Sequence, residues 1–183
     1  SAFAECSKMV SIDIPKGVVN IGHRCFFSCS KLKSIEIPAG VTLLEIEVFS
    51  LCTELTSIEI PENVIAICSS AFCGCCKLES INLPDSLSSI MEYAFEGCSQ
   101  LITITIPDSV RSIGAGAFHG CSGIQELSIP DSVDFIGIEA FSGCSGLLSI
   151  NIPTKIEEIC DFLFYNCSRL TSLVIPPHIT KIG

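Results

Sequence analysis

Thirteen cysteines and three histidines are the side chains in this sequence with the most chemical potential. Converging thiolates and imidazoles would hold zinc, two close thiols would form a disulfide, and a thiol beside an imidazole would act as a nucleophile. Each of these chemistries requires the side chains to meet in space. Whether they meet depends on the elements that position them.

The chain has a 23-residue period. Phenylalanine occurs at eight places 23 residues apart, which are Phe3, Phe26, Phe49, Phe72, Phe95, Phe118, Phe141 and Phe164. A proline follows each of them after twelve residues, from Pro15 to Pro176. A fixed period in this range is the signature of a stacked repeat architecture. Each repeat is numbered here from its phenylalanine, position 1, to position 23.

Positions 7 to 13 predict a strand in every repeat. In the fourth repeat, Ile81 and Leu83 alternate with polar residues and lead to Pro84. This alternation is typical of a strand with one buried face, and the proline marks its end. The apolar residues after the turn, such as Val110, Ile113 and Ala117, fit either a short strand or a 3₁₀ turn on the back of the coil.

A single repeat cannot bury its own apolar residues, so the repeats must stack around one shared core. We therefore expect a repeat solenoid of about eight coils, forming one domain over residues 1–183. The sequence starts and stops inside the repeat pattern. It is accordingly expected to be part of a longer array, without caps.

The motifs L-x-x-I-x-I-P and A-F-x-G-C-x-x-L resemble those of the BspA-like, or Treponema pallidum type, leucine-rich repeats. The resemblance covers all eight repeats and about ten of their 23 positions. It implies a right-handed coil with a parallel β-sheet on its concave side and short 3₁₀, helical or extended segments on its convex side. It also implies a surface or secreted protein that adheres to host proteins or other cells.

Local backbone bulges are expected where the sequence departs from the family pattern. The second repeat departs at Glu45, Ile46 and Val48 and has Leu51 where later repeats carry glycine at position 3; the last departs at Leu163 and has Asn166 at position 3. The recurring glycines at positions 3 and 20 are interpreted as tight turns.

Eight cysteines share position 4 and are interpreted as reduced core residues: Cys6, Cys29, Cys52, Cys75, Cys98, Cys121, Cys144 and Cys167. Stacked strands hold Cβ atoms about 4.8 Å apart, farther than the ~3.8 Å of a disulfide. The other five are Cys25, Cys68, Cys73, Cys76 and Cys160. Unpaired thiols are favoured there over a local disulfide or a metal site, although many free thiols are unusual outside the cell.

No catalytic group or cofactor site is predicted. The C-x-x-C pair of Cys73 and Cys76 lacks the second pair that would indicate zinc. His23, His119 and His178 occupy three different repeat positions, so a nucleophile and a base are not expected to converge. The sequence therefore predicts no metal, no cofactor and no enzyme.

Composition limits the partners. The formal net charge is −10, with ten Lys and Arg spread along the chain, which disfavours nucleic acid and suits either solubility or a basic protein partner. No apolar run approaches the ~20 residues of a membrane-spanning helix, so this segment is not expected to insert into a membrane. The uncovered ends of the array predict end-to-end self-association.

Positions 9 and 11 face outward from the predicted sheet and vary between repeats. Position 9 is nearly a serine ladder, whereas position 11 changes from acidic to neutral to apolar. The predicted ligand-binding residues are Asp13, Glu36, Glu59, Asn82, Thr105, Ser128 and Asn151 from position 11, with Glu126 from position 9. Stacked carboxylates repel, and a basic ligand or a cation could offset that cost. The alternative is a solvated polar face without a ligand.

Together these features predict a non-enzymatic protein-binding module. The family resemblance favours a surface or secreted adhesin segment that contacts host or neighbouring-cell proteins. The alternative is an intracellular, cytoplasmic scaffolding protein, for which the free thiols would be ordinary.

Overall fold

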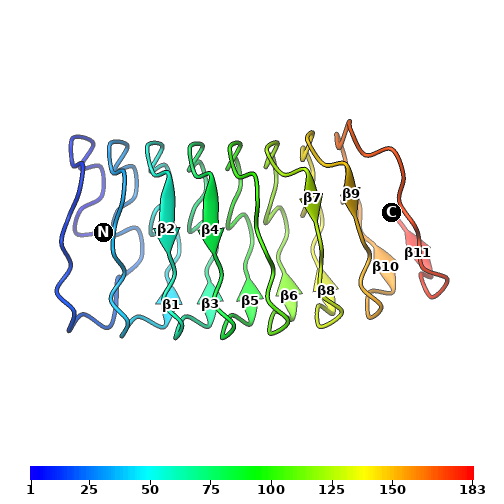
Figure 1. Cartoon of the computed structure of the whole chain (residues 1–183), viewed down its shortest axis with the longest axis horizontal. Coiled ribbons are helices and arrows are strands. Elements are labelled where there is room, and N and C mark those ends of the chain that lie inside the picture. Colours follow the sequence, from blue (N-terminus) through cyan, green and yellow to red (C-terminus); the bar gives the residue numbers. More distant parts are fainter.

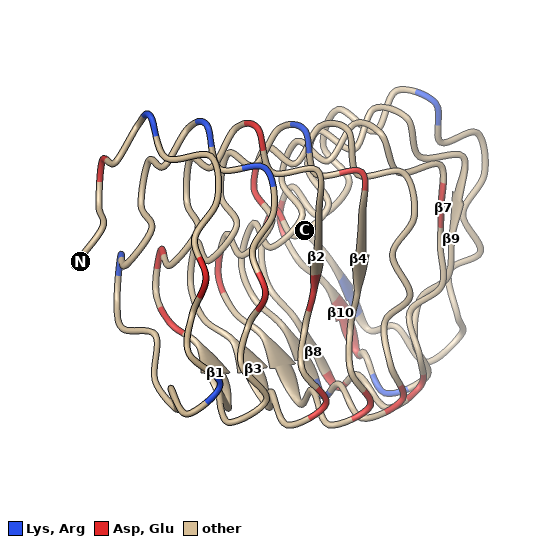
Figure 2. Cartoon of the chain, turned by 60° about the vertical axis from the view of Figure 1, so that its left-hand side comes forward, with Lys and Arg blue, Asp and Glu red and all other residues tan.

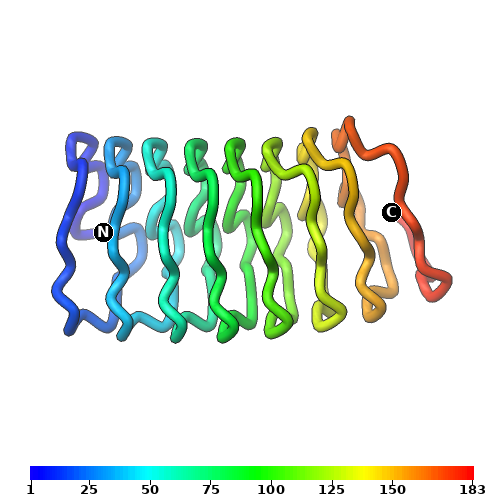
Figure 3. Tube along the Cα trace, in the orientation of Figure 1, coloured from blue at the N-terminus to red at the C-terminus, as the bar shows by residue number.

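The computed structural model describes all residues from 1 to 183 as a stack of similar coils. The chain advances by one coil per repeat, and its two ends lie at opposite ends of the stack (Figure 1). The Cα trace shows the same path repeated from coil to coil, with the widest departure near the C-terminus (Figure 3). The predicted repeat solenoid is therefore confirmed.

The strand predicted in every repeat forms in four of the eight, at positions 9 to 11, whereas repeats 1, 2, 5 and 8 have no strand there. These front strands are β2 (Ser57–Glu59), β4 (Ser80–Asn82), β7 (Glu126–Leu127) and β9 (Ser149–Ile150). β2 pairs with β4 and β7 with β9, both in parallel, and a single bridge joins Ser80 to Thr103 between them. Each residue pairs with the residue 23 positions later, as Ile58 does with Ile81. The sequence period thus sets the register.

A second row of strands lies at positions 18 and 19, on the back of the coil. Five form one parallel sheet, namely β1 (Leu43–Leu44), β3 (Ala66–Ile67), β5 (Ser89–Ile90), β6 (Ser112–Ile113) and β8 (Phe135–Ile136). A further parallel pair is β10 (Glu158–Ile159) with β11 (Lys181–Ile182). The back segment is therefore extended at positions 18 and 19 and then enters hydrogen-bonded turns, in which Ala117 N–H donates to Gly114 O at 3.2 Å. Both conformations that the apolar spacing allowed are present. The structure contains no helix long and apolar enough to cross a bilayer.

Two turn positions in each coil have a left-handed backbone. At position 3 this conformation is taken by Gly74 (φ +72°) and equally by Leu51 (φ +61°) and Asn166 (φ +58°). The expected bulges at those two residues are therefore wrong. Leu51 N–H still donates to Cys73 O at 2.7 Å, so its turn continues the regular ladder between coils.

Position 22 is the second left-handed site, and the sequence does not reveal it because glycine fills it only once. Tyr93 has φ +55° and Glu139 has φ +57°. Tyr93 N–H donates to Ala115 O of the next coil at 2.9 Å, which holds the residue in a conformation that L-residues disfavour. Gly114, at position 20, has another role: a Cβ there would lie 2.5 Å from Glu92 N. Close coil packing, not a left-handed turn, explains that glycine.

The core is one cluster of 49 buried residues that runs along the stack. Its most regular part is the phenylalanine column at position 1. Adjacent rings are stacked, with centroids 5.4 to 6.0 Å apart in all seven pairs. Most of these rings are fully buried, because each is covered by the ring before it and the ring after it.

The position 4 cysteines form a second column and make a specific hydrogen bond. From Cys29 to Cys167, each Sγ donates to the phenylalanine carbonyl of the preceding coil at 3.1 to 3.3 Å. All thirteen cysteines are free thiols. Burial is the main cause that raises the pKa of both Cys52 and Cys144 to about 12. These seven thiols are packing residues that bind between coils, in agreement with their interpretation as core. Cys6 is the exception, because in the first coil it is exposed and has no preceding coil to bind.

This raised pKa predicts a loss of stability in alkali. A thiol in the unfolded chain ionises near pH 9, whereas Cys52 and Cys144 stay neutral in the fold until about pH 12. Their contribution is therefore complete below pH 9 and is lost as the pH rises from 9 towards 12. We expect the free energy of unfolding to fall by about 1 to 2 kcal/mol per thiol between about pH 8 and pH 10.5.

The control is the double variant Cys52→Val with Cys144→Val, measured by urea unfolding at both pH values. It should lose less stability in alkali than the original chain, because two of the ionising groups are absent. An equally steep loss would show that other groups cause the alkaline effect.

Candidate functional site

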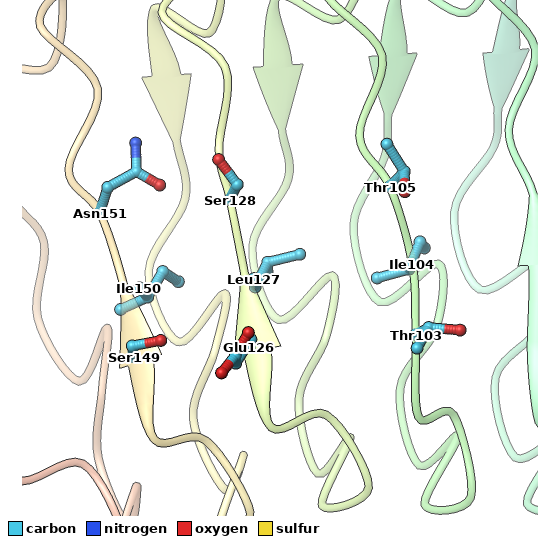
Figure 4. Close-up of a pocket in the computed structure, with 9 residues that line it drawn as sticks. All are labelled: Thr103, Ile104, Thr105, Glu126, Leu127, Ser128, Ser149, Ile150 and Asn151. Atoms are coloured by element: carbon cyan, nitrogen blue, oxygen red, sulfur yellow. The ribbon is translucent and has the colours of Figure 1, made fainter.

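The residues at positions 9 and 11 point to solvent along the front strands. In β2, Ser57 and Glu59 are exposed on either side of buried Ile58. Figure 4 shows the same alternation in later coils, where Leu127 turns away from the surface that Glu126 and Ser128 share. The two outward columns are therefore placed as the sequence predicts.

The structure divides the eight predicted site residues between two shallow grooves on this face. The acidic groove is lined by Asp13, Glu36, Glu59 and Asn82 among others. The neutral groove is lined by Thr105, Glu126, Ser128 and Asn151 among others. The predicted set left out Glu62 and the position 9 residues Ser11, Ser34 and Ser57, which join the first groove, and Thr103 and Ser149, which join the second. Thr103 and Ser149 belong to the position 9 ladder. Because this position was predicted to face outward, the sequence alone could have included them in the site.

The acidic groove holds carboxylates without cationic partners. Asp13, Glu36 and Glu59 are exposed in three consecutive coils, and none makes an ion pair or a side-chain hydrogen bond. Figure 2 shows acidic stretches on β2 and on the coils that precede it. The lysines that form ion pairs do so elsewhere: Lys31 and Lys77 pair with Glu54, the latter at 2.9 Å, and Lys181 Nζ contacts Glu158 at 2.6 Å. The groove therefore keeps its negative charge for solvent or a ligand.

The neutral groove contains hydroxyl groups, one carboxylate and one fixed amide. Asn151 Nδ2 donates to Ile129 O at 2.7 Å, and Asn151 Oδ1 accepts from Ile129 N–H at 2.8 Å. This amide thus bonds to the backbone of the preceding coil, and its polar atoms are already engaged. Glu126, in contrast, has no hydrogen-bond or ion-pair partner.

The cysteines and histidines do not assemble a reactive centre. Cys73 Sγ donates to Glu96 Oε2 at 3.4 Å, whereas Cys76 Sγ donates to Thr53 O at 3.7 Å, so the two thiols of the C-x-x-C pair have different partners. Burial, with the Glu96 charge next, raises the pKa of Cys73 to about 11. No three His, Cys, Asp or Glu side chains are arranged to hold a metal ion. His119 Nδ1 lies 3.9 Å from Glu139, on the turn edge of the coil.

Comparison with known families gives one match that spans the chain. The model of the BspA type leucine rich repeat region matches residues 1–101 and 65–183, with six copies. The family model thus counts fewer repeats than the eight that the phenylalanine period gives. No match is found among curated proteins.

Solved structures share the fold. A leucine-rich repeat protein from Bacteroides ovatus is 34% identical, with a TM-score of 0.88, over 95% of this chain and 48% of that one. The chain thus spans about half the length of that protein. The leucine rich repeat protein of T. pallidum is 26% identical, with a TM-score of 0.68, over 96% of this chain and 74% of that one. A leucine-rich repeat protein from Eubacterium ventriosum, 17% identical with a TM-score of 0.51, shows the fold alone.

The bonds of Asn151 predict a stability effect that is specific to one coil. Asn151→Ala removes both hydrogen bonds to Ile129, leaving a partly buried N–H and C=O without those partners. We expect a loss of about 1 to 3 kcal/mol in the free energy of unfolding, measured in guanidinium chloride.

Asn82 supplies a matched control, since it occupies the same repeat position but makes no side-chain hydrogen bond. Asn82→Ala should change the free energy of unfolding by less than about 0.5 kcal/mol. Equal losses in the two variants would mean that the Asn151 bonds do not stabilise the coil.

Proposed function

Because the chain belongs to the BspA type leucine-rich repeat family, we propose that it is a non-enzymatic protein-binding module, a segment of a surface or secreted adhesin. The observation that carries the proposal is the acidic groove. Its carboxylates lie in consecutive coils, stay exposed and have no internal partner. A basic protein surface on a host or neighbouring cell is the matching partner.

The large number of free thiols is only a weak argument against a surface location. Seven of the position 4 thiols donate to a phenylalanine carbonyl, and most are buried. A thiol whose pKa is raised by burial reacts slowly, because the thiolate is the reactive form. Such residues can remain reduced in an oxidising compartment.

The spacing of the coils indicates what shape of basic segment would fit. Phenylalanine centroids in the first three coils are 5.5 and 5.6 Å apart. An α-helix rises about 5.4 Å per turn, whereas an extended strand advances about 6.6 to 6.8 Å for each pair of residues. A helix along the stack, with one Lys or Arg per turn, therefore keeps the period of the phenylalanine column, and we propose that it meets one carboxylate per coil at Asp13, Glu36 and Glu59.

Charge reversal tests the groove. The double variant Glu36→Lys with Glu59→Lys should weaken binding of a helical peptide with Lys at i, i+4 and i+7 by at least about tenfold, because attraction becomes repulsion. Affinity is measured by calorimetry at low salt, and circular dichroism checks the fold.

The matched control is Asp134→Lys with Glu157→Lys. These acids are also exposed, one coil apart, but both lie at position 17, outside the groove. The control should bind as the original chain does. Equal affinity of the groove variant and the original chain would rule out the acidic groove as the binding site.

We also propose that this 183-residue chain self-associates head to tail. Its end coils expose apolar residues that inner coils cover, with Phe3 38% and Ile182 62% exposed. Successive coils bind each other through two different faces, one on the N-terminal side and one on the C-terminal side. The last coil of one chain can therefore stack on the first coil of another. Light scattering should show an average mass that rises with concentration. A constant monomer mass at high concentration would contradict this.

A further inference from the structure

The neutral groove differs from the acidic groove in its chemistry. It runs across three coils and has a volume of about 620 Å³. Two rows of polar side chains border it (Figure 4), Thr103, Glu126 and Ser149 on one side and Thr105, Ser128 and Asn151 on the other. Between the rows, the position 10 side chains turn into the core. The groove is thus a trough along the stack, with polar rows on both sides and an apolar floor formed by Ile104, Leu127 and Ile150.

The floor of this trough has no room for an added strand. β7 and β9 pair with each other in parallel, and the strand hydrogen bonds run between coils. The N–H and C=O of Ile129 are both bonded to Asn151. A peptide cannot add to the trough as an extra strand, because strand addition needs a free sheet edge. Each strand here has a neighbouring coil on both sides, with phenylalanine centroids 5.4 to 6.0 Å apart, which leaves no room for another strand. Recognition here depends on side chains.

The free side chains favour a ligand rich in hydroxyl groups. Thr103, Thr105, Ser128 and Ser149 make no side-chain hydrogen bond within the protein, and a hydroxyl both donates and accepts. Glu126 accepts only, and it is the one carboxylate among the residues that line the trough. No lysine or arginine lines it, so an anionic ligand has no partner. Four neutral groups beside a single charge also give a polybasic ligand little to bind.

We propose that the neutral groove binds a linear, neutral polysaccharide that lies along the stack, with its sugar rings between the two rows. Glu126 accepts hydrogen bonds from sugar hydroxyls, which the negative charge strengthens. Thr103 and Ser149, one coil away on either side, bond to the neighbouring rings. Asn151, held by its bonds to Ile129, forms a fixed wall. This function is separate from the protein binding proposed for the acidic groove.

The probes are linear hexasaccharides of β-1,4-glucose, β-1,4-mannose and α-1,4-glucose, titrated calorimetrically into the whole 183-residue chain. At least one should bind saturably. Its affinity should be unchanged between about 0.05 and 0.5 M NaCl, because binding of a neutral ligand involves no attraction between opposite charges that salt could screen. Glu126→Gln keeps the shape of the side chain but removes its charge. It should weaken binding about tenfold, the cost of a lost charged hydrogen bond.

The double variant Glu36→Lys with Glu59→Lys is the matched control and should bind the saccharide as the original chain does. If this variant binds saccharide normally but no longer binds the basic peptide, the two grooves are independent binding sites. The proposal is overturned if no saccharide binds at about 10 mM, a concentration at which even weak complexes form. It is also overturned if Glu126→Gln binds with unchanged affinity, or if salt abolishes binding.

Discussion

Each coil depends on its neighbours to cover its apolar side chains. A phenylalanine ring at position 1 is covered by the rings of the coils on both sides, with centroids 5.4 to 6.0 Å away. The cysteine at position 4 donates its thiol proton to the preceding phenylalanine carbonyl. Backbone hydrogen bonds also join adjacent coils at these positions, as Phe72 N–H donates to Ala94 O of the next coil. Because all these contacts repeat every 23 residues, a shift of one residue would break them together.

This constraint leaves only outward positions free to differ from coil to coil. Along positions 9 and 11 the chain changes from unpaired carboxylates near the N-terminus to hydroxyl groups in later coils. The scaffold under both grooves is the same, so their chemistry differs through side chains alone. One regular stack can therefore present two sites of different character, as expected where function is carried by variable residues on a fixed fold.

The sequence predicts the parts of the fold that depend on period and alternation. The front strands and the outward direction of Glu36, Glu59 and Glu126 follow from them. The back strands are only two residues long, too short for alternation to distinguish them from a turn. The left-handed backbone at Tyr93 and Glu139 was not predictable, because it is imposed by bonds to the next coil and not by glycine. The same holds for Asn151, whose amide bonds depend on the backbone of another coil.

The central claim, that stacking between coils stabilises this structure, is tested most directly by comparing Phe95→Ala with Phe3→Ala. Phe95 is fully buried between two rings, whereas Phe3 has one neighbouring ring and is 38% exposed. Guanidinium unfolding should show a loss of about 3 to 5 kcal/mol for Phe95→Ala and less than half of that for Phe3→Ala. Equal losses in the two variants would contradict the account, since the number of covering coils would then not matter.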